Sequence, residues 1–341
     1  MHSCLSHQAL GRELSGEYPL PSAYHTSAQL ELPPVGIVVL NYNNYDDTRD
    51  CLESLSRLQY GGGFFVILVD NGSTDGSGDR LATDFPIHTA LHLTKNRGFA
   101  GGNNAGIRLA LHRGAKYIWL VNNDAVVRPD ALTVLVRMAE RHGDVGFFGS
   151  VIVYYSDRER VWFGGGGFGR RSGRIWNEGF EKTASSEMSM GPERKTSWVT
   201  GCSLLVRAAT VREIGLLDES YFLYREELEW QLRANPGKPE AYLSTEPIVA
   251  HKVGRTTGSS QSSLGVAFMS RNFLKLANDH AGAALPIWLV RWWVEYITIP
   301  ILRGKPCMIR DAVGALMFIG EPGEKLFKAV TDDCHERDRN P

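Results

Sequence analysis

The 341-residue chain has almost no net charge and few cysteines. Its formal net charge of -1 argues against a nucleic-acid-binding surface as its main function. The five cysteines are odd in number and scattered, and no C-x-x-C pair occurs among them. This pattern indicates the reduced, structural thiols of a cytosolic protein rather than a disulfide framework or a zinc site.

The first 34 residues lack the apolar core that a secretory signal needs between a basic start and a small-residue cleavage site. Their mixture of Ser, Gly, His, Glu and Pro predicts a loosely ordered leader over residues 1–34, with a short helix near Ala9–Leu14 as an alternative. Internal repeats are also lacking. The remaining composition is ordinary for a globular protein and allows one large α/β domain with an appendage, or two modest domains.

Apolar runs rich in β-branched residues alternate with segments of helical spacing through the first half of the chain. This alternation predicts parallel β-α-β units, and hence an α/β sheet covered on both faces. The predicted strands are Val35–Leu40, Phe64–Val69, Ile87–Leu93 and Tyr117–Val121, and the predicted helices are Asp46–Leu58, Asn103–Arg113 and Pro129–His142.

Polar residues follow the carboxyl ends of these predicted strands, at the edge where open α/β sheets bind their ligands. A single polar cluster after a strand is usually only a turn, but several at corresponding ends would meet in one crevice. The clusters are Asn41-Tyr42-Asn43, Asp70-Asn71-Gly72, Asn96-Arg97-Gly98 and Asn122-Asn123-Asp124.

The second half of the chain differs in character from the first. Beyond Gly265 the sequence becomes helical, with a tryptophan-rich stretch at Pro286–Leu302. Between the two lie predicted strands at Val145–Tyr155, Trp198–Arg207 and Ile248–His251, a short helix at Ala208–Ile214, and a mobile polar segment at Glu181–Lys195.

The polar motifs, taken in their order, resemble glycosyltransferase family 2 and, within it, the bacterial rhamnosyltransferase-like enzymes. The resemblance covers roughly Val35 to Asn278. It implies a GT-A type nucleotide-diphospho-sugar transferase fold, which is a Rossmann-like mixed α/β sheet, with a C-terminal helical appendage. The expected division is a catalytic domain at 35–264, with a nucleotide-binding half (35–127) and an acceptor half (128–264), and a helical region at 265–341. The motifs are Asn41-Tyr42-Asn43, Asp70-Asn71-Gly72-Ser73-Thr74-Asp75-Gly76-Ser77, Asn96-Arg97-Gly98-Phe99-Ala100-Gly101-Gly102-Asn103-Asn104-Ala105-Gly106 and Asn122-Asn123-Asp124.

Asp70 is the main expected nucleoside contact. A carboxylate at a strand end can accept hydrogen bonds from a base N–H or a ribose hydroxyl, although Asp-Asn-Gly also favours a turn by itself. In the resembling family this aspartate contacts the nucleoside, and Asn103 and Asn104 stand where nucleoside-contacting side chains are expected. Many relatives carry Arg in place of Asn103. The other expected nucleotide contacts are Asn41, Asn43, Asn96, Gly98 and Asn123.

Asn122-Asn123-Asp124 is the expected metal site. A nucleotide diphosphate departs as a highly charged anion, and a divalent cation that bridges its phosphates neutralises that charge. Mg²⁺ or Mn²⁺ needs hard oxygen ligands and often only one or two protein carboxylates. Many relatives carry Asp-x-Asp here, so Asp124 becomes the main carboxylate ligand and Asn122 a neutral helper or nucleotide contact.

His251 follows a short apolar run, and a lone histidine at a strand end is more often structural than a ligand. In the resembling enzymes a histidine at this point joins the metal or the diphosphate, and His251 matches it. The candidates for contacts to phosphate oxygens of the donor or of a lipid-linked acceptor are Lys252, Arg255, Arg271 and Asn272.

The stretch Tyr221–Arg233 resembles the aromatic-rich Glu-Asp motif of the family. In relatives the second acid removes the proton of the acceptor hydroxyl. Here that position is Glu227, one methylene longer than the usual Asp. Glu226 is the alternative, because a shift of one residue exchanges the two roles. Without the resemblance, these acids also fit a solvated helix face.

Two further segments carry weaker signals. Gly164–Gly169 contains a formal G-x-G-x-x-G but does not open a helix, so we expect a flexible wall of the acceptor side rather than a dinucleotide fingerprint. Pro286–Leu302 is apolar but interrupted by charges, which are costly in a spanning helix. It fits either a core or dimer-contact helix or a membrane-interface helix, with Trp288, Trp292, Trp293 and Tyr296 near the headgroups and Arg291 and Arg303 facing anionic lipid.

The sequence therefore predicts a cytoplasmic, inverting glycosyltransferase that uses a divalent cation, Mg²⁺ or Mn²⁺, and moves a sugar from a nucleotide diphosphate donor to an acceptor hydroxyl. The resemblance favours rhamnose as the sugar and a polyprenyl-diphosphate-linked saccharide as the acceptor, in cell-envelope polysaccharide or glycolipid assembly at the inner face of the plasma membrane. A homodimer is a further partner that the sequence neither requires nor excludes. The alternatives are an inactive glycosyltransferase-like binding module and a nucleotide-dependent oxidoreductase.

Overall fold

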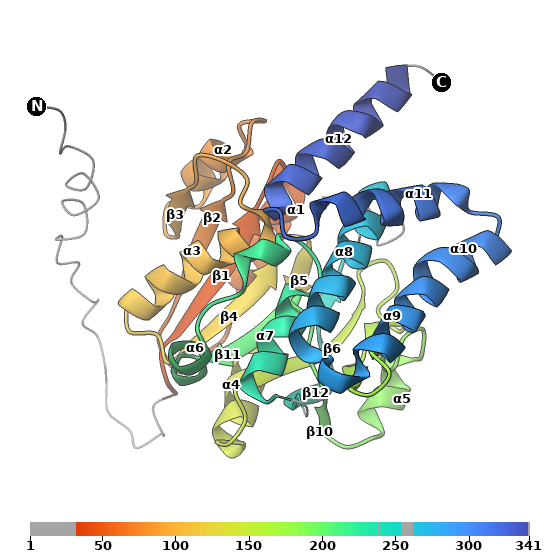
Figure 1. Cartoon of the computed structure of the whole chain (residues 1–341). Coiled ribbons are helices and arrows are strands. Elements are labelled where there is room, and N and C mark those ends of the chain that lie inside the picture. Colours follow the sequence, from red (N-terminus) through yellow and green to blue (C-terminus); the bar gives the residue numbers. More distant parts are fainter. Residues whose placement is uncertain (1–31, 237–238, 254–261, 340–341) are drawn as a thin grey trace, which may run out of the picture. The chain divides into compact units, whose positions relative to one another are not determined.

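One large mixed β-sheet forms the centre of the structure (Figure 1). The computed structural model describes residues 32–236, 239–253 and 262–339. Residues 1–31 of the leader predicted over residues 1–34, and the phosphate contact predicted at Arg255, therefore lie outside the described residues. The strands follow the order β10-β12-β6-β11-β4-β1-β2-β3, with β5 beside β12 and β7 beside β6. They are β1 (Val35–Asn41), β2 (Phe64–Asp70), β3 (Thr89–His92), β4 (Tyr117–Asn122), β5 (Ala125–Val127), β6 (Phe147–Tyr154), β7 (Val161–Phe163), β10 (Glu193–Thr196), β11 (Ser203–Arg207) and β12 (Ala241–His251).

Parallel and antiparallel pairs meet at β11. The strands β4, β1, β2 and β3 are parallel, as the β-α-β pattern predicts. The strand β11 is antiparallel to both of its neighbours, β4 and β6, and β12 then runs parallel to β6. The sheet is therefore mixed, and the apolar runs of β4, β1 and β2 all become polar at the same edge.

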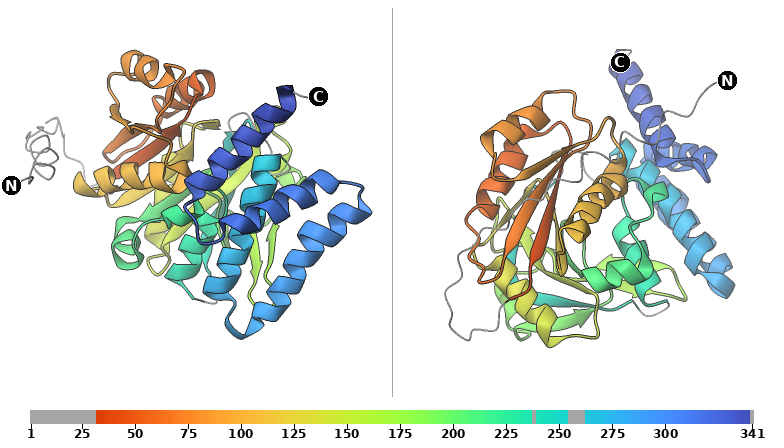
Figure 2. Two further views of the ribbon diagram at one scale, coloured as in Figure 1. Left: turned by 45° about the horizontal axis from the view of Figure 1, so that its top comes forward. Right: turned by 90° about the vertical axis from the view of Figure 1, so that its left-hand side faces the viewer.

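Helices cover the sheet on both faces. The helices α1 and α3 lie on opposite faces, and the C-terminal helices lie on the side of α3 (Figure 2). The helices before residue 240 are α1 (Tyr45–Leu55), α2 (Ser77–Asp84), α3 (Gly98–His112), α4 (Ala131–Arg141), α5 (Ala184–Met188), α6 (Ala208–Ile214), the 3₁₀ turn η1 (Glu219–Tyr221) and α7 (Glu226–Ala234). The later ones are α8 (Ser263–His280), η2 (Gly282–Ala284), α9 (Leu285–Trp293), η3 (Val294–Thr298), α10 (Ile299–Leu302), α11 (Pro306–Gly314), η4 (Ala315–Phe318) and α12 (Gly323–Arg339).

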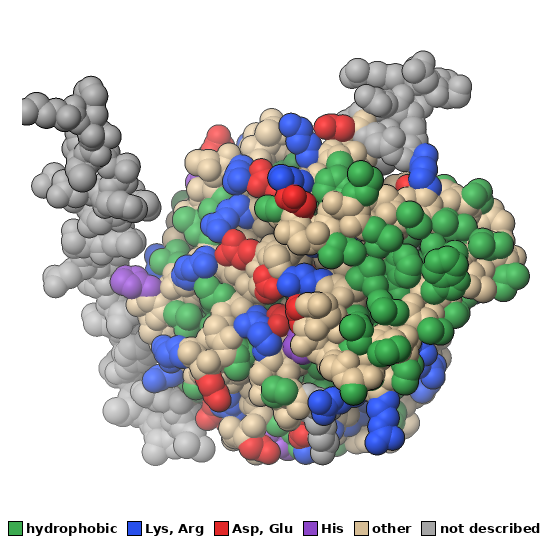
Figure 3. Space-filling model, viewed as in Figure 1, with side chains coloured by type: hydrophobic (Ala, Val, Ile, Leu, Met, Phe, Trp, Pro, Cys, Tyr) green, Lys and Arg blue, Asp and Glu red, His purple; other side chains and the backbone are tan. Residues whose placement is uncertain are grey.

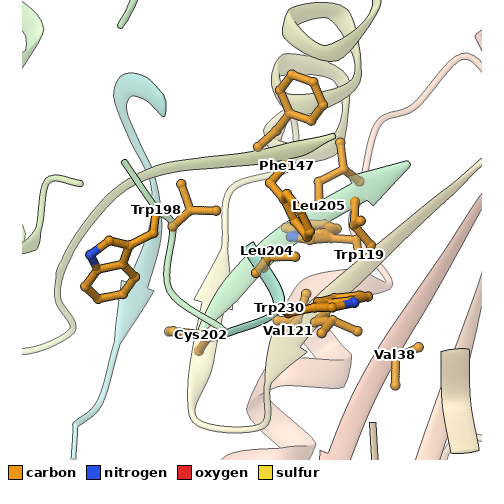
Figure 4. Packing of buried hydrophobic residues seen from close by; sticks show 14 of the residues in the cluster. Val38, Trp119, Val121, Phe147, Trp198, Cys202, Leu204, Leu205 and Trp230 are labelled. Atoms are coloured by element: carbon orange, nitrogen blue, oxygen red, sulfur yellow. The ribbon is translucent and has the colours of Figure 1, made fainter. Parts of the chain in front are cut away.

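Aromatic side chains fill the core between the sheet and α7 (Figure 4). Trp119 of β4 and Trp230 of α7 are fully buried, and the Trp230 ring centroid lies 5.3 Å from that of Phe147 in β6. Both indole N–H groups are satisfied, because Trp119 donates to the Ser203 hydroxyl and Trp230 to the Gly215 carbonyl. Truncating a buried tryptophan costs about 3–5 kcal/mol, so Trp230 fixes α7 firmly on the sheet.

The helix α3 begins at Gly98, before the predicted start at Asn103. Its first turn is capped from outside, because the Phe222 carbonyl accepts a hydrogen bond from the Phe99 N–H at 2.6 Å. Gly98 has φ +70°, and a Cβ at this position would collide with the same carbonyl. A contact with a segment far along the chain therefore sets the start of α3.

Two segments predicted as flexible are ordered. Gly164–Gly169, predicted as a flexible wall, contains β8 (Gly166–Gly169), which pairs with β9 (Arg174–Asn177) in a hairpin. Glu181–Lys195, predicted as mobile, contains α5 and most of β10. Arg194 in β10 donates to Glu178 at 2.7 Å and to the buried Glu187 at 3.3 Å. These ion pairs join residues that sequence periodicity does not connect.

The tryptophan-rich stretch is one long helical segment with one face turned inward. Trp288 is fully buried, and Trp292 and Tyr296 are almost so, because they recur every four residues on the face that packs against the protein. The prediction that these three side chains lie near the headgroups is wrong in this structure. Arg291 also faces the protein, since its Nε donates to the Ser172 carbonyl at 2.6 Å. Trp293 alone among the three α9 tryptophans is exposed.

Candidate active site

The register of the sheet brings the predicted strand-end residues together. Asn41 at the end of β1 pairs with Asp70 at the end of β2, and Leu40 pairs with Asn122 at the end of β4. Because the three strands are parallel, their carboxyl ends open on one edge. The prediction that these polar clusters meet in one place is confirmed for the ends of β1, β2 and β4.

A cleft with a volume of about 1130 Å³ lies at this edge. It takes side chains from the strand ends, from the loop before α7, from β12 and from the C-terminal helices. The predicted site residues that line it are Asn96, Gly98, Asn122, Asn123, Asp124, Glu226, Glu227 and His251.

Asp70 is held in place by its neighbours. The Asn41 side chain is fully buried and donates to Asp70 Oδ1 at 3.1 Å and to the Ser77 hydroxyl at 2.9 Å. Its own oxygen accepts a hydrogen bond from Thr48 at 2.9 Å. Asp70 Oδ2 lies 3.6 Å from His92 Nδ1. The Asn41 amide therefore orients Asp70 from inside the sheet edge.

Asn43 and Asn96 brace the loops beside Asp70. The exposed Asn43 accepts a hydrogen bond from the Thr74 N–H at 2.8 Å and so joins the loop after β1 to the loop after β2. Asn96 Oδ1 accepts from Asn71 Nδ2 at 3.0 Å and from the Gly98 N–H at 2.8 Å. Asn71 was not predicted as a site residue, yet it lines the cleft and ties this loop to β2.

Asn103 and Asn104 are buried on α3 and bind protein groups. Asn103 donates to the Phe99 carbonyl at 2.9 Å. Asn104 donates to the Leu217 carbonyl at 2.9 Å and to Glu219 Oε1 at 3.1 Å, and accepts from the Leu217 N–H at 3.1 Å. The structure thus places Asn104 as a tie between α3 and the segment before α7.

Asp124 and His251 form a buried pair at the cleft. Asp124 Oδ1 lies 3.0 Å from His251 Nε2. Burial works against ionisation of Asp124, but the hydrogen bond and charge of His251, with a hydrogen bond from Asn122, keep the pKa of Asp124 below its ordinary value. Burial disfavours the imidazolium of His251, yet the sulfur of Cys202 and the Asp124 carboxylate beside it raise the pKa of His251 to about 10. This polar pair combines a carboxylate and an imidazole, which are both metal-ligand types.

The other predicted phosphate contacts have protein partners. Lys252 pairs with Asp47 at 2.7 Å and with Asp50 at 2.6 Å. Arg271 and Asn272 are buried on α8, and their side chains donate to backbone carbonyls of Ser220–Tyr224. The expectation that Arg271 and Asn272 reach a phosphate is not met in this structure, because these donors are already engaged in the interior.

Glu226 and Glu227 begin α7 and line the cleft. Burial, followed by the charge of Glu227, raises the pKa of Glu226 well above its ordinary value. Burial also raises the pKa of Glu227, while nearby backbone N–H groups, including that of Gly201, oppose the rise. The Oε2 atom of each carboxyl is enclosed and has no hydrogen-bond partner among the described residues. The pair thus places two buried carboxyl groups with raised pKa values side by side at a helix N-terminus, where negative charge is favoured.

Sequence reasoning missed an aromatic wall of the cleft. The Trp162 ring centroid lies 4.3 Å from that of His251. Trp176 of β9 and Trp198 line the same cleft. A Cβ at Gly166 would collide with the Trp198 ring, and one at Gly167 with the Trp176 ring. The glycine-rich run is therefore a floor for two indoles, and its glycines beside tryptophans were the available signal.

The fold is shared with known glycosyltransferases. A mannosyltransferase from Pyrobaculum calidifontis, solved in complex with GDP-Man and Mn²⁺, matches with a TM-score of 0.50 over 84% of this chain and 75% of that one, at 15% identity. Residues 1–349 of TarS from S. aureus match with a TM-score of 0.53 over 84% of this chain and 80% of that one, at 13% identity. The mixed sheet with its strand-edge cleft is a GT-A type nucleotide-diphospho-sugar transferase fold, as predicted.

Sequence comparison places the chain more narrowly. Residues 36–192 match the family described as glycosyl transferase family 2. An N-acetylglucosaminyl-diphospho-decaprenol L-rhamnosyltransferase of Mycobacterium tuberculosis is 28% identical over 244 residues, which cover 67% of this chain and 76% of the relative. Galactofuranosyltransferase GlfT1 of the same organism is 30% identical over 178 residues, 49% of this chain and 54% of that protein. Residues 36–192 are therefore a glycosyltransferase family 2 domain, and the resemblance to rhamnosyltransferase-like enzymes stated from the motifs is confirmed.

Proposed function

We propose that this protein is an inverting, divalent-cation-dependent glycosyltransferase that moves a sugar from a nucleotide diphosphate donor to an acceptor hydroxyl. The observation that carries the proposal is that Asp124–His251 and Glu226–Glu227 line the same cleft. Such a reaction needs groups for a departing diphosphate and a base for an incoming hydroxyl in one place. The two pairs come from distant parts of the chain, so only the fold brings them together, which supports a functional site rather than a chance cluster of neighbouring residues.

On the donor side we assign the nucleoside contact to Asp70. Its Oδ1 accepts a hydrogen bond from Asn41 at 3.1 Å, and its Oδ2 lies 3.6 Å from His92 Nδ1. We assign Asn41, Asn43, Asn103 and Asn104 to loop and carboxylate positioning, because their hydrogen bonds go to protein groups. Asn96, Gly98 and Asn123 stay assigned to the nucleotide, since they line the cleft.

Asp124 and His251 fit a divalent cation. The described residues hold no cluster of three or more His, Cys, Asp or Glu side chains that could bind a metal ion. Mg²⁺ and Mn²⁺ do not need one, because donor phosphates and water complete their coordination. Asp124 Oδ1 and His251 Nε2 lie 3.0 Å apart at the cleft, so one ion could reach both atoms once the imidazole gives up its proton. The bound cation would neutralise charge on the departing diphosphate.

Glu227 is assigned as the general base. It accepts the proton of the acceptor hydroxyl, the acceptor oxygen attacks the anomeric carbon, and the bond from that carbon to the diphosphate breaks on the opposite face. Configuration inverts, and no covalent sugar–enzyme intermediate forms. Burial raises the pKa of both carboxyls, and the charge of Glu227 adds to the rise at Glu226. We assign the base to Glu227 because it stands at the position of the second acid in the Glu-Asp motif that the chain resembles. A raised pKa also makes Glu227 a better proton acceptor near neutral pH.

A thermal-shift screen of nucleotide sugars, with and without Mn²⁺, tests the donor and the cation together. A ligand that binds the folded state raises the apparent melting temperature by mass action. We expect the largest shift for deoxythymidine-diphosphate rhamnose with Mn²⁺, ahead of uridine-diphosphate sugars. A screen in which no nucleotide sugar shifts the transition would refute the donor assignment, and a bound nicotinamide would point to an oxidoreductase instead.

For the acceptor we propose a polyprenyl-diphosphate-linked saccharide at the inner face of the plasma membrane. The Mycobacterium tuberculosis relative is named for such an acceptor, a diphospho-decaprenol. The segment Gly282–Leu302 is long and apolar enough to span a bilayer by length and composition alone, and 28% of its apolar stretch is buried in the protein. Arg291 and Glu295 within it form an ion pair at 2.9 Å, and its tryptophan face packs on the protein, so we favour a surface position.

The segment has two faces that suit this task. Glu295 and Tyr296 line the cleft. The opposite side belongs to an exposed apolar face that continues onto the next helices (Figure 3). Patches of this kind mark protein or membrane contacts. We define the apolar face as the exposed side chains Ile287, Leu289, Val290, Trp293, Val294, Ile301, Leu302, Val313, Met317 and Ile319.

Co-sedimentation with anionic liposomes tests the membrane assignment. The wild type should sediment at low salt, and Trp293→Glu combined with Ile301→Glu should stay in the supernatant, because two charges in the apolar face oppose insertion. Ile87→Glu is the matched control, since Ile87 is exposed but lies outside the apolar face. A wild type that stays in solution would refute the membrane assignment, and a dimer that the double variant dissociates would assign the face to a second copy of the chain.

A further inference from the structure

The loop that leads into α7 has a costly backbone conformation. Phe222, Tyr224 and Arg225 have φ values of +62°, +67° and +73°, although none is glycine. The Leu223 N–H bonds the Tyr221 carbonyl at 2.7 Å, which closes a tight three-residue turn around Phe222. Residues held in such regions persist only when the surrounding structure over-determines them, and they concentrate at functional sites. Glu226 and Glu227 follow this loop directly.

Asn272 of α8 holds the loop from the C-terminal side. Its Nδ2 lies 3.0 Å from the Tyr221 carbonyl oxygen and 2.8 Å from those of Leu223 and Tyr224. Asn272 is fully buried, so its amide is an interior donor to these carbonyls, and its removal leaves them without that donor. Its neighbour Arg271, also buried, donates to the Ser220 carbonyl at 2.9 Å. Two adjacent side chains thus donate hydrogen bonds to the carbonyls on both sides of the turn.

The loop has two further anchors. The Phe222 ring stacks on Phe268 of α8 at 5.6 Å between centroids, in the small hydrophobic cluster of the C-terminal helices. Its carbonyl meanwhile caps α3. Arg225 donates from Nη2 to the Tyr296 hydroxyl at 3.1 Å. Both Arg225 and Tyr296 line the cleft beside Glu227.

We propose that Asn272 is a positioning residue for Glu227, assisted by the Arg225–Tyr296 hydrogen bond. Asn272 acts through the backbone of Tyr221–Arg225, which sets the direction in which α7 presents its first carboxylates. The role rests on the proposed function, because it presumes that Glu227 is the base. The helical region from residue 263 onward therefore belongs to the catalytic machinery and is not an appendage that could be removed without loss of turnover.

The test compares Asn272→Ala with Asn278→Ala, an exposed asparagine on the same helix. The assay is rhamnose transfer from deoxythymidine-diphosphate rhamnose to a polyprenyl-diphosphate-linked saccharide, with full-length protein. We expect kcat of Asn272→Ala to fall about 10²-fold, as small misplacements of catalytic groups do, with donor affinity within about twofold. Its kcat–pH profile should shift, because the surroundings of Glu227 change. Amide hydrogen exchange at Phe222–Arg225 should accelerate, and Asn278→Ala should match the wild type in every measurement.

Tyr296→Phe covers the case in which Asn272→Ala fails to fold. It removes one hydroxyl and should lower kcat about 2- to 10-fold, the value of one hydrogen bond, with unchanged melting temperature. Folded Asn272→Ala with wild-type kcat and exchange rates overturns the proposal, as does Tyr296→Phe with wild-type kcat when Asn272→Ala is unfolded. If Glu227→Gln retains full turnover, the base assignment fails instead. The exchange measurement needs no substrate and separates the two failures.

Discussion

The two walls of the cleft are held in place by different means. On the wall that we assign to the donor, Asn122 ends β4 at the cleft, and the sheet register places Asn41 and Asp70 at the ends of the next parallel strands. On the base wall, Glu227 follows a loop with positive φ values that residues on α3 and α8 hold from a distance. A strand end is a rigid place for a side chain, whereas a loop becomes rigid only through partners. We therefore expect substitutions on the donor wall to act locally, and those behind the base wall to act at a distance.

Asp124→Ala should have the largest effect. Charge stabilisation by a bound cation is worth several kcal/mol, so loss of its main carboxylate should lower turnover about 10³-fold. The melting temperature should also fall, because Asp124→Ala leaves the buried His251 imidazolium without its partner. Excess chelator should silence the wild type to the same level in the transfer assay. Full activity in chelator would contradict the cation assignment.

Glu227→Gln should lower kcat about 10²-fold or more, because the amide keeps the size of the side chain but cannot accept the proton. Donor affinity, measured by calorimetry, should stay near the wild-type value since the base acts on the acceptor. Glu226→Gln is the matched comparison and should retain most activity. The reverse result, an inactive Glu226→Gln beside a nearly normal Glu227→Gln, would exchange the two roles.

The pH dependence of the wild type should follow the raised pKa values of the two glutamates. Glu227 must be ionised to act, so kcat should fall about tenfold per pH unit once the pH drops below its raised pKa. Stability should change in the opposite direction. Folded protein binds these protons more tightly than unfolded protein, so the contribution is full below the ordinary value of 4.5 and is lost as pH rises through the folded pKa. Glu226→Gln should flatten this stability change in denaturant titrations at several pH values.

Asp70→Asn and Asn104→Ala should distinguish a residue that binds the donor from a residue that stabilises the fold around the site. Loss of a charged hydrogen-bond acceptor should weaken donor binding about tenfold in Asp70→Asn. Asn104→Ala should leave donor affinity within about twofold, because the Asn104 side chain binds Leu217 and Glu219 rather than the cleft. It should instead lower the free energy of unfolding by about 1–3 kcal/mol through unsatisfied buried groups. Equal losses of donor affinity in both variants would return Asn104 to the nucleotide site.

The sequence by itself determined the parallel strands β1 to β4 and their polar ends, and it carried the family resemblance. Apolar runs followed by polar clusters mark strand ends directly, so the donor wall, Asp124 and the Glu226–Glu227 pair were predictable from the chain and its resemblance. Two charges interrupt the tryptophan-rich helix, and on that ground the sequence predicts that it does not span a bilayer.

Only the tertiary structure decided which polar residues face the cleft and which ones hold it. Asn41, Asn104 and Asn272 are all short amides near the motifs, and no local pattern distinguishes a donor to a ligand from a donor to a distant carbonyl. The same holds for the glycines under Trp176 and Trp198, and for Trp288 and Trp292 turned inward while Trp293 stays exposed. Hydrogen bonds and close packing depend on what lies opposite each side chain, and residues far along the chain supply those neighbours.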